Sequence, residues 1–154
     1  MDAKNMDFTL EELKILAENG QKDLQYAVGF YYENGIHTLT DYAQAAQWYE
    51  KAAEKDHVDA LLHLGFLYAQ GKGVKKDETR AFSYIKRAAE TGSKNAQYNL
   101  ARCYEEGIGT RQDYSKAFDW YKKVIESNGE CLYNIREEGV LAVSFFFCAR
   151  GTAN

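Results

Sequence analysis

The sequence contains no proline, only three cysteines and no apolar run long enough to span a bilayer. Proline is the residue that most often breaks a helix, so its absence allows helices throughout the chain. The longest apolar stretch, Val140–Ala149, is interrupted by Ser144, whereas a membrane-spanning helix needs about 20 apolar residues. The sequence therefore predicts no membrane insertion.

Positive charge is also not in excess, because 19 lysines and arginines against 23 acidic residues give a net charge of −4. A nucleic-acid partner needs a basic surface, so none is predicted. Cys103, Cys131 and Cys148 lack zinc-site spacing, and no cofactor or metal is predicted. Free thiols in a reducing compartment, with no secretory signal in Met1–Leu16, predict a cytoplasmic location.

What the sequence does contain is an internal repeat of 36 residues. Five residue types recur in register three times without a gap. They are Tyr32, Tyr68 and Tyr104; Gly35, Gly71 and Gly107; Asp41, Asp77 and Asp113; Ala45, Ala81 and Ala117; and Glu54, Glu90 and Glu126. Three units of one length predict a repeat architecture, in which each unit buries its apolar face against the next.

The sequence pattern of each unit predicts two helices. The first carries an apolar face at i, i+4 and i+8 and stops at a glycine; its three copies are Lys22–Asn34, Asp59–Gln70 and Asn95–Glu106. The second opens with an aspartate that can cap the free amides; its copies are Asp41–Lys55, Asp77–Thr91 and Asp113–Ser127. Thr9–Asn19 predicts a lone second helix, with Thr9 and Glu12 as a capping box.

The middle unit carries the most complete motif. It reads Ala60-x-x-x-Leu64-Gly65-x-x-Tyr68-x-x-Gly71-x-Gly73-Val74-x-x-Asp77-x-x-x-Ala81-x-x-Tyr84-x-x-x-Ala88-Ala89-x-x-Gly92. This pattern closely resembles the Sel1-like repeat. The related tetratricopeptide repeat has a period of about 34 residues, which is shorter than the 36 of this sequence. The resemblance implies an all-α fold, a right-handed superhelical solenoid of antiparallel helix pairs.

The predicted organisation is a single solenoid domain over residues 1–154. It has an N-terminal half-repeat helix at 8–20, full repeats at 23–56, 59–92 and 95–128, and a degenerate partial repeat with a C-terminal cap or tail at 130–154. The partial repeat is indicated by Tyr133-Asn134-Ile135, which echoes Tyr98-Asn99-Leu100.

The resemblance implies a non-catalytic adaptor or scaffold for a protein or peptide partner. Stacked helix pairs form a concave surface suited to binding, and a second stripe on the first helices would line this groove by analogy with tetratricopeptide repeats. The stripe consists of Tyr26, Phe30, Glu33, Asn34, Leu62, Phe66, Gln70, Tyr98, Arg102, Glu105 and Glu106. Aromatic and arginine side chains are frequent binding anchors. The sequence equally allows Tyr26, Phe30, Leu62 and Phe66 to pack against the next unit.

An enzyme is not predicted, although one alternative belongs to that class. Ser83 and Lys86 fit the Ser-x-x-Lys motif of penicillin-recognising enzymes, but their Ser-Asp-Asn and Lys-Thr-Gly motifs are missing. Some cysteine-rich Sel1-like proteins are linked to β-lactam binding, yet their paired cysteines are lacking here. A β-lactam-binding or β-lactam-hydrolysing enzyme on the same scaffold stays the alternative, and a purely structural spacer is a third.

The C-terminal tail, Gly139–Asn154, contains the segment Val140–Cys148, which is apolar, prone to β structure and almost uncharged. Terminal units of a solenoid need a cap, so the tail predicts a helix or strand folded over the open end. Self-association through the tail is a second interpretation, because exposed apolar patches mark interfaces. A third is that the tail stands where further repeats would follow.

Overall fold

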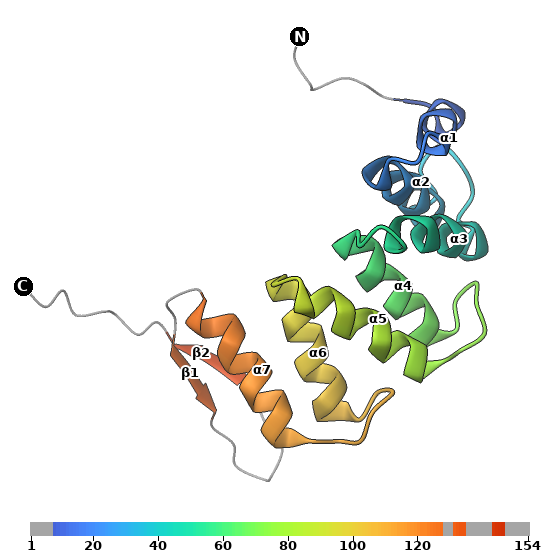
Figure 1. Ribbon diagram of the computed structural model, residues 1–154. Helices are drawn as coiled ribbons and strands as arrows, with labels where there is room; N and C mark the ends of the chain where they lie inside the picture. Colours follow the sequence, from blue (N-terminus) through green and yellow to red (C-terminus); the bar gives the residue numbers. More distant parts are fainter. Residues whose placement is uncertain (1–7, 128–130, 135–142, 147–154) are drawn as a thin grey trace, which may run out of the picture.

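The structure, a computed structural model, describes residues 8–127, 131–134 and 143–146. These residues form seven helices and a two-stranded hairpin, which follow one another along an arc (Figure 1). The helices are α1 (Leu10–Glu18), α2 (Lys22–Asn34), α3 (Tyr42–Ala53), α4 (Val58–Gln70), α5 (Glu78–Glu90), α6 (Lys94–Glu106) and α7 (Tyr114–Glu126). Unit one holds α2 and α3, unit two α4 and α5, and unit three α6 and α7. The predicted all-α solenoid is confirmed.

The helix ends follow the signals in the sequence. Asp41, Asp77 and Asp113 each accept a hydrogen bond of 3.0 Å from the backbone amide three residues later. Such a cap satisfies one of the free amides of the first turn. Thr9 and Glu12 form the predicted capping box of α1. Each first helix ends at a glycine in the left-handed conformation.

Within a unit, the two helices are joined by a loop that closes in the same way each time. The amides of Asp41, Asp77 and Asp113 donate to the carbonyls of Tyr32, Tyr68 and Tyr104, at 2.8, 2.9 and 2.8 Å. A residue that caps the second helix through its side chain is thus tied to the first helix through its backbone. The side-chain cap accounts for the aspartate in every unit, whereas the backbone bond does not depend on the residue type.

The core is built from small side chains where the helices approach and from larger ones between them. Ala45, Ala81 and Ala117 have no exposed surface, as expected one turn into each second helix. At Gly65 a Cβ would come within 2.8 Å of Ile85, so the helices of unit two touch at the glycine backbone. Leu61, Leu64 and other buried leucines of α4 each contribute about 1.5–3 kcal/mol of apolar burial.

A second glycine in the loop fixes how one unit sits on the previous one. Gly73 (φ +68°) rests on the start of α3, and Gly109 (φ +66°) rests on Glu78 and Phe82 of α5. A Cβ at either position would overlap the backbone of the preceding unit. His37 stands at this position in unit one and keeps a positive φ of 56° with its side chain exposed.

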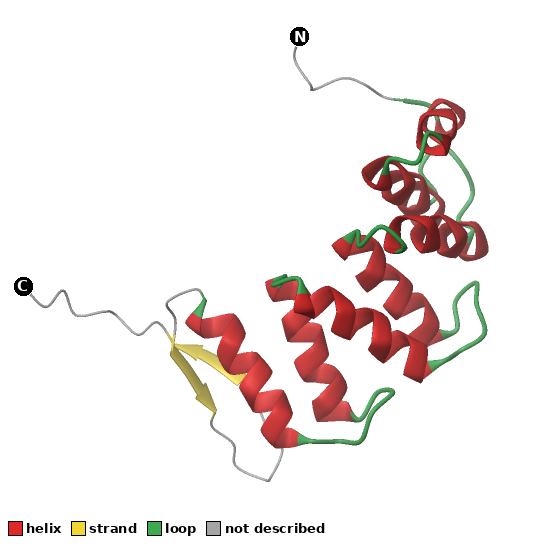
Figure 2. Cartoon of the chain, in the orientation of Figure 1, coloured by secondary structure: helices red, strands yellow, loops and turns green. Residues whose placement is uncertain are grey.

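After α7, β1 (Cys131–Asn134) pairs antiparallel with β2 (Val143–Phe146), with Cys131 opposite Phe146. Figure 2 shows this hairpin at the end of the arc beside α7. Tyr133 and Asn134 therefore lie in a strand, not at the start of a fourth helical unit as their echo of Tyr98-Asn99 suggested. Aromatic and β-branched residues such as those of β2 favour strands, and β1 is the segment that pairs with them.

The rest of the segment 130–154, including most of the tail Gly139–Asn154, lies outside the described residues. Capping, self-association and replacement of further repeats therefore stay predictions. Among the described helices, none has the length and apolar character needed to cross a membrane.

Candidate functional site

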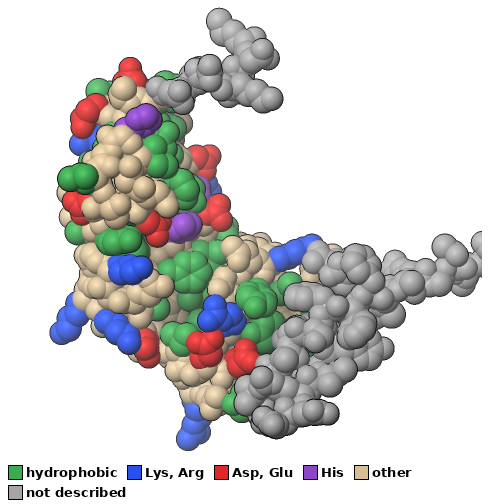
Figure 3. All heavy atoms as spheres, turned by 180° about the vertical axis from the view of Figure 1, so that it is seen from behind, with side chains coloured by type: hydrophobic (Ala, Val, Ile, Leu, Met, Phe, Trp, Pro, Cys, Tyr) green, Lys and Arg blue, Asp and Glu red, His purple; other side chains and the backbone are tan. Residues whose placement is uncertain are grey.

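The predicted groove residues lie on the first helices α2, α4 and α6. Figure 3, which views the molecule from behind, shows hydrophobic side chains gathered in the hollow of the arc, with charged side chains and a histidine beside them. Of the predicted residues, Asn34, Gln70, Tyr98, Arg102 and Glu106 are exposed. Tyr26, Phe30, Glu33, Phe66 and Glu105 are partly buried.

Leu62 is the one predicted groove residue that the structure buries. It is 2% exposed and belongs to the main core cluster, together with Leu100 of the following unit. Its position in the repeat is also that of Tyr26 and Tyr98, and this position packs toward the next unit. Tyr98, in the last unit, stays 39% exposed. Leu62 is thus a core residue, and its assignment to the groove is wrong.

Tyr26 stands at the centre of a ring cluster between units one and two. Its ring stacks on that of His57 with centroids 4.6 Å apart, and it meets Tyr49 at 5.7 Å. Its hydroxyl lies 3.4 Å from Nε2 of His63. Burial raises the pKa of the Tyr26 phenol, and the carboxylates of Asp59 and Glu33 raise it further. Two carboxylates, those of Asp59 and Glu33, thus act on this phenol.

Glu33 binds two donors through one oxygen. Its Oε2 accepts a hydrogen bond of 2.5 Å from the hydroxyl of Tyr49 and lies 2.7 Å from Nδ1 of His63. Burial pushes the pKa of Glu33 upward, but the hydrogen bonds from His63 and Tyr49 together hold it below its usual value. Glu33 is therefore an ionised carboxylate in a partly buried place.

Unit three repeats half of this arrangement, and unit two replaces it. The hydroxyl of Tyr121 donates to Glu105 at 2.7 Å, as that of Tyr49 does to Glu33. At the equivalent positions unit two has Ile85 and Ala69. Burial and the carboxylate partner raise the pKa of both Tyr49 and Tyr121. The acceptor is thus present only in the units where a buried phenol needs one.

The row formed by Phe30, Phe66 and Arg102 changes chemistry along the arc. These three residues occupy the same position in successive units. Phe30 and Phe66 make edge contacts with the ring of His63, at 6.2 and 6.4 Å. Arg102 instead bonds through Nε and Nη2 to one oxygen of Glu106, at 3.1 and 2.7 Å. The apolar end of the row therefore lies over units one and two.

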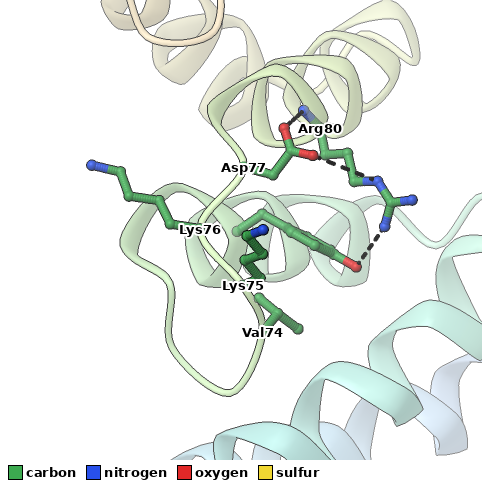
Figure 4. A pocket seen from close by; sticks show the side chains of 6 residues that line it. Val74, Lys75, Lys76, Asp77 and Arg80 are labelled. Carbon is green, nitrogen blue, oxygen red and sulfur yellow. Dashed lines mark hydrogen bonds and ion pairs between the residues drawn. The ribbon is translucent and has the colours of Figure 1, made fainter.

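A cavity of about 460 Å³ lies outside the predicted groove, at the loop between α4 and α5. Figure 4 shows Arg80 of α5 reaching toward Asp77, while Lys76 points away from the other side chains that line the cavity. Arg80 Nη1 donates to the hydroxyl of Tyr68 at 3.1 Å. A second cavity of about 150 Å³ lies between Glu50, Tyr84 and Arg87. Neither is lined by a residue of the predicted groove.

Two histidines and a tyrosine complete the site, and the sequence analysis did not place them there. Nδ1 of His57 accepts from the amide of Ala60 at 3.1 Å, so His57 is the N-cap of α4. His63 and Tyr49 hold Glu33. The signal was present in the register, because Gln21 and Ser93 share the position of His57, and Ser93 caps α6.

The one cysteine of the described helices, Cys103, does not have the character of a reactive thiol. Cys103 is free and buried, and burial raises the pKa of its thiol to about 11, whereas reactive cysteines need a lowered pKa. No group of three metal-ligating side chains comes together in the part of the chain that the structure describes. Ser83 and Lys86 of the penicillin-type motif are both exposed on α5.

Comparison with known families gives three consecutive matches. The Sel1 repeat profile matches residues 23–57, 58–93 and 94–128. No curated protein sequence matches the chain.

Three solved structures that are similar to the chain come from bacteria. A protective antigen of uropathogenic Escherichia coli strains with an SLR fold is 37% identical at a TM-score of 0.74, covering 77% of this chain and 25% of that one. A Sel1 repeat protein from Oxalobacter formigenes is 30% identical at a TM-score of 0.72, and the match covers 77% of this chain and 49% of that one. Helicobacter pylori cysteine rich protein B is 33% identical at a TM-score of 0.53, and the match covers 56% of this chain and 65% of that one. The chain thus spans less than two thirds of each.

Proposed function

The chain belongs to the Sel1 repeat family, whose members are generally protein-interaction scaffolds, and we propose that it is a non-catalytic adaptor. In this proposal the first helices hold a peptide or a loop of a partner protein against their concave face. We also propose a cytoplasmic location, which rests on the cysteine usage of the sequence.

The observation that carries the proposal is an aromatic surface without a cover. Phe30 is partly exposed and contacts the rings of Tyr26 and His63, yet it lies outside the hydrophobic clusters formed by the described residues. Tyr98 is 39% exposed on the same row of helices. Large aromatic side chains that are half desolvated already lose little further entropy on binding, and they dominate interface energetics.

The test compares two variants of equal composition. The groove variant carries Phe30→Ser, Tyr98→Ser and Arg102→Ser on the first helices. The control carries Phe118→Ser, Tyr114→Ser and Arg111→Ser, which are exposed or nearly so around α7. Each protein is used for affinity capture with mass-spectrometric identification, after circular dichroism has shown that all three have equal helix content.

We expect a protein captured by the wild type and by the control to be lost from the groove variant. Binding of a synthetic peptide from that protein to the wild type would then locate the contact. Identical capture by all three proteins, or no reproducible capture, would contradict the groove and leave the structural spacer as the better interpretation.

A further inference from the structure

Negative charge and aromatic rings meet at one place on the concave face, between the first helices of units one and two. We refer to it as the α2–α4 surface. It is formed by Tyr26, Phe30, Glu33, Asp59, His63 and Phe66. Asp59 is exposed and the other five are partly buried. The side chains are therefore open to a partner while their rings are held in place by one another.

Two carboxylates of this surface have unused acceptor capacity. The two donors of Glu33 both lie on Oε2, and no hydrogen bond in the described part of the chain occupies Oε1. Asp59 has no hydrogen bond or ion pair with any described residue, and it acts electrostatically on both Tyr26 and His57. A third carboxylate, Asp23, lies 3.3 Å from Nε2 of His57. The site thus offers acceptors at Glu33 Oε1 and at Asp59 that no described lysine or arginine uses, while His63 pairs with Oε2 of Glu33.

The nearby lysines and Arg102 form no ion pair with Glu33 or Asp59 in the described part of the chain. Lys72 acts on Glu33 from the loop after α4, but its Nζ lies over the ring of Tyr42 at 5.3 Å. Lys22 acts on His57. Arg102, the cation of the same row of the repeat, is bound to Glu106 in unit three. Glu33 Oε1 and the carboxylate of Asp59 therefore remain without a lysine or arginine partner among the described residues.

Aromatic faces next to carboxylates are suited to one class of ligand. A lysine ammonium or an arginine guanidinium is attracted to the face of an aromatic ring, and more strongly when the site is partly desolvated. Arginine also pairs with carboxylates through a planar fork of donors. Both side chains have an apolar stem, which can lie along phenylalanine rings while the charged head stays at the carboxylates.

We propose that the α2–α4 surface binds a lysine or arginine side chain of the partner segment, with the stem of that side chain over Phe30 and Phe66. This inference rests on the proposed function and specifies its partner as a cationic, partly apolar peptide. Unit three binds a different part of the segment, because Arg102 and Glu106 already satisfy each other there.

The test uses fluorescein-labelled peptides in which leucine alternates with arginine, with citrulline or with glutamate. Citrulline keeps the shape of arginine without its charge, so the comparison isolates the charge. Fluorescence anisotropy of the full chain should show binding of the arginine peptide at least about tenfold tighter than the citrulline peptide. The difference should shrink as salt is added, because exposed charges are screened.

Asp59→Asn should weaken binding of the arginine peptide about three- to tenfold and leave the affinity for the citrulline peptide unchanged. Asp119→Asn is the matched control, because Asp119 is exposed on α7 away from the surface. Tyr26→Leu, which copies the residue of unit two, removes the ring face and should also weaken binding. Thermal unfolding of each variant shows whether it stays folded.

Equal affinity for the arginine and citrulline peptides, or equal effects of Asp59→Asn and Asp119→Asn, would overturn the inference. So would a wild type that binds none of the three peptides. The proposed function is judged separately: a partner lost from the Phe30–Tyr98–Arg102 variant supports it even where Asp59→Asn has no effect.

Discussion

Glu33 and Tyr49 show that the same pair of repeat positions can be occupied in two stable ways within one chain. In units one and three, a buried phenol donates to a carboxylate of the neighbouring helix. In unit two, both positions are apolar, with Ile85 packed against Gly65. A buried hydroxyl without an acceptor is costly, so the two residues of each pair must change together.

Tyr49→Phe should lower the free energy of unfolding by about 1.5–3 kcal/mol, because a hydrogen bond to a charged group is lost. The low pKa of Glu33 contributes stability above its unfolded value of about 4.3, and this contribution is lost as pH falls through the folded pKa. The effect of the mutation should therefore shrink in acid. Urea denaturation at several pH values measures it. Tyr31→Phe is the control, and an equal loss in both variants would contradict the role of Glu33.

His57 predicts a second pH dependence, with a different origin. Its neutral ring caps α4 through Nδ1, and burial lowers its pKa, although Asp23 and Asp59 act in the opposite direction. The unfolded chain then takes up the proton first, so stability falls as pH drops from about 6.5 through the lower folded pKa.

His57→Ser, which copies the cap of α6, should keep the helix and remove this part of the slope. Urea midpoints on either side of the transition, compared with those of His37→Ser, test the assignment. If the pH dependence survives in His57→Ser and disappears in His37→Ser, then the titrating residue is His37 and the assignment to His57 is wrong.

At the scale of elements, two loop glycines have similar backbone conformations, but replacing them by alanine should lower the free energy of unfolding by different amounts. Gly92 (φ +94°) has open space around the position of a Cβ, whereas Gly109 (φ +66°) lies against α5. Gly92→Ala should cost only the strain of a left-handed residue, about 1–2 kcal/mol. Gly109→Ala adds an overlap with the previous unit, which costs about 1–3 kcal/mol more. Chemical denaturation of the two variants compares them, and equal losses would mean that the loop does not hold the units together.

Most elements were predictable because each signal occurs three times. The period places Asp77 at a cap and Gly71 at a helix end, and agreement between units corrects any single residue. The repeat could not place Leu62, since its position is partly buried at Tyr26, buried at Leu62 and exposed at Tyr98. It also could not foresee Glu33 between His63 and Tyr49, which depends on the unit next to it. The strands β1 and β2 have no counterpart in the repeat.

At the scale of the whole molecule, a solenoid is stabilised by contacts between neighbouring units, so its ends are the weakest parts. Seven residues of α4 are buried, against three to six in each of the other described helices. Amide hydrogen exchange should therefore be slowest in α4 and fastest in α1, with opening from the ends inward. Exchange at one rate in all seven described helices would instead indicate a single cooperative unit.

The contact of Gly109 with the start of α5 also makes the molecule extensible. If residues 58–93 were duplicated in place, Gly73 of the copy would meet the same α5 start that Gly109 meets now, because both units carry Glu78 and Phe82 at that spot. Each copy would thus bring the docking surface that its successor requires. The loop contact can therefore be reused in every added repeat, each of which would carry another Phe66 and another Gln70. His63 of the copy, however, would face Ala69 and Ile85 in place of Glu33 and Tyr49.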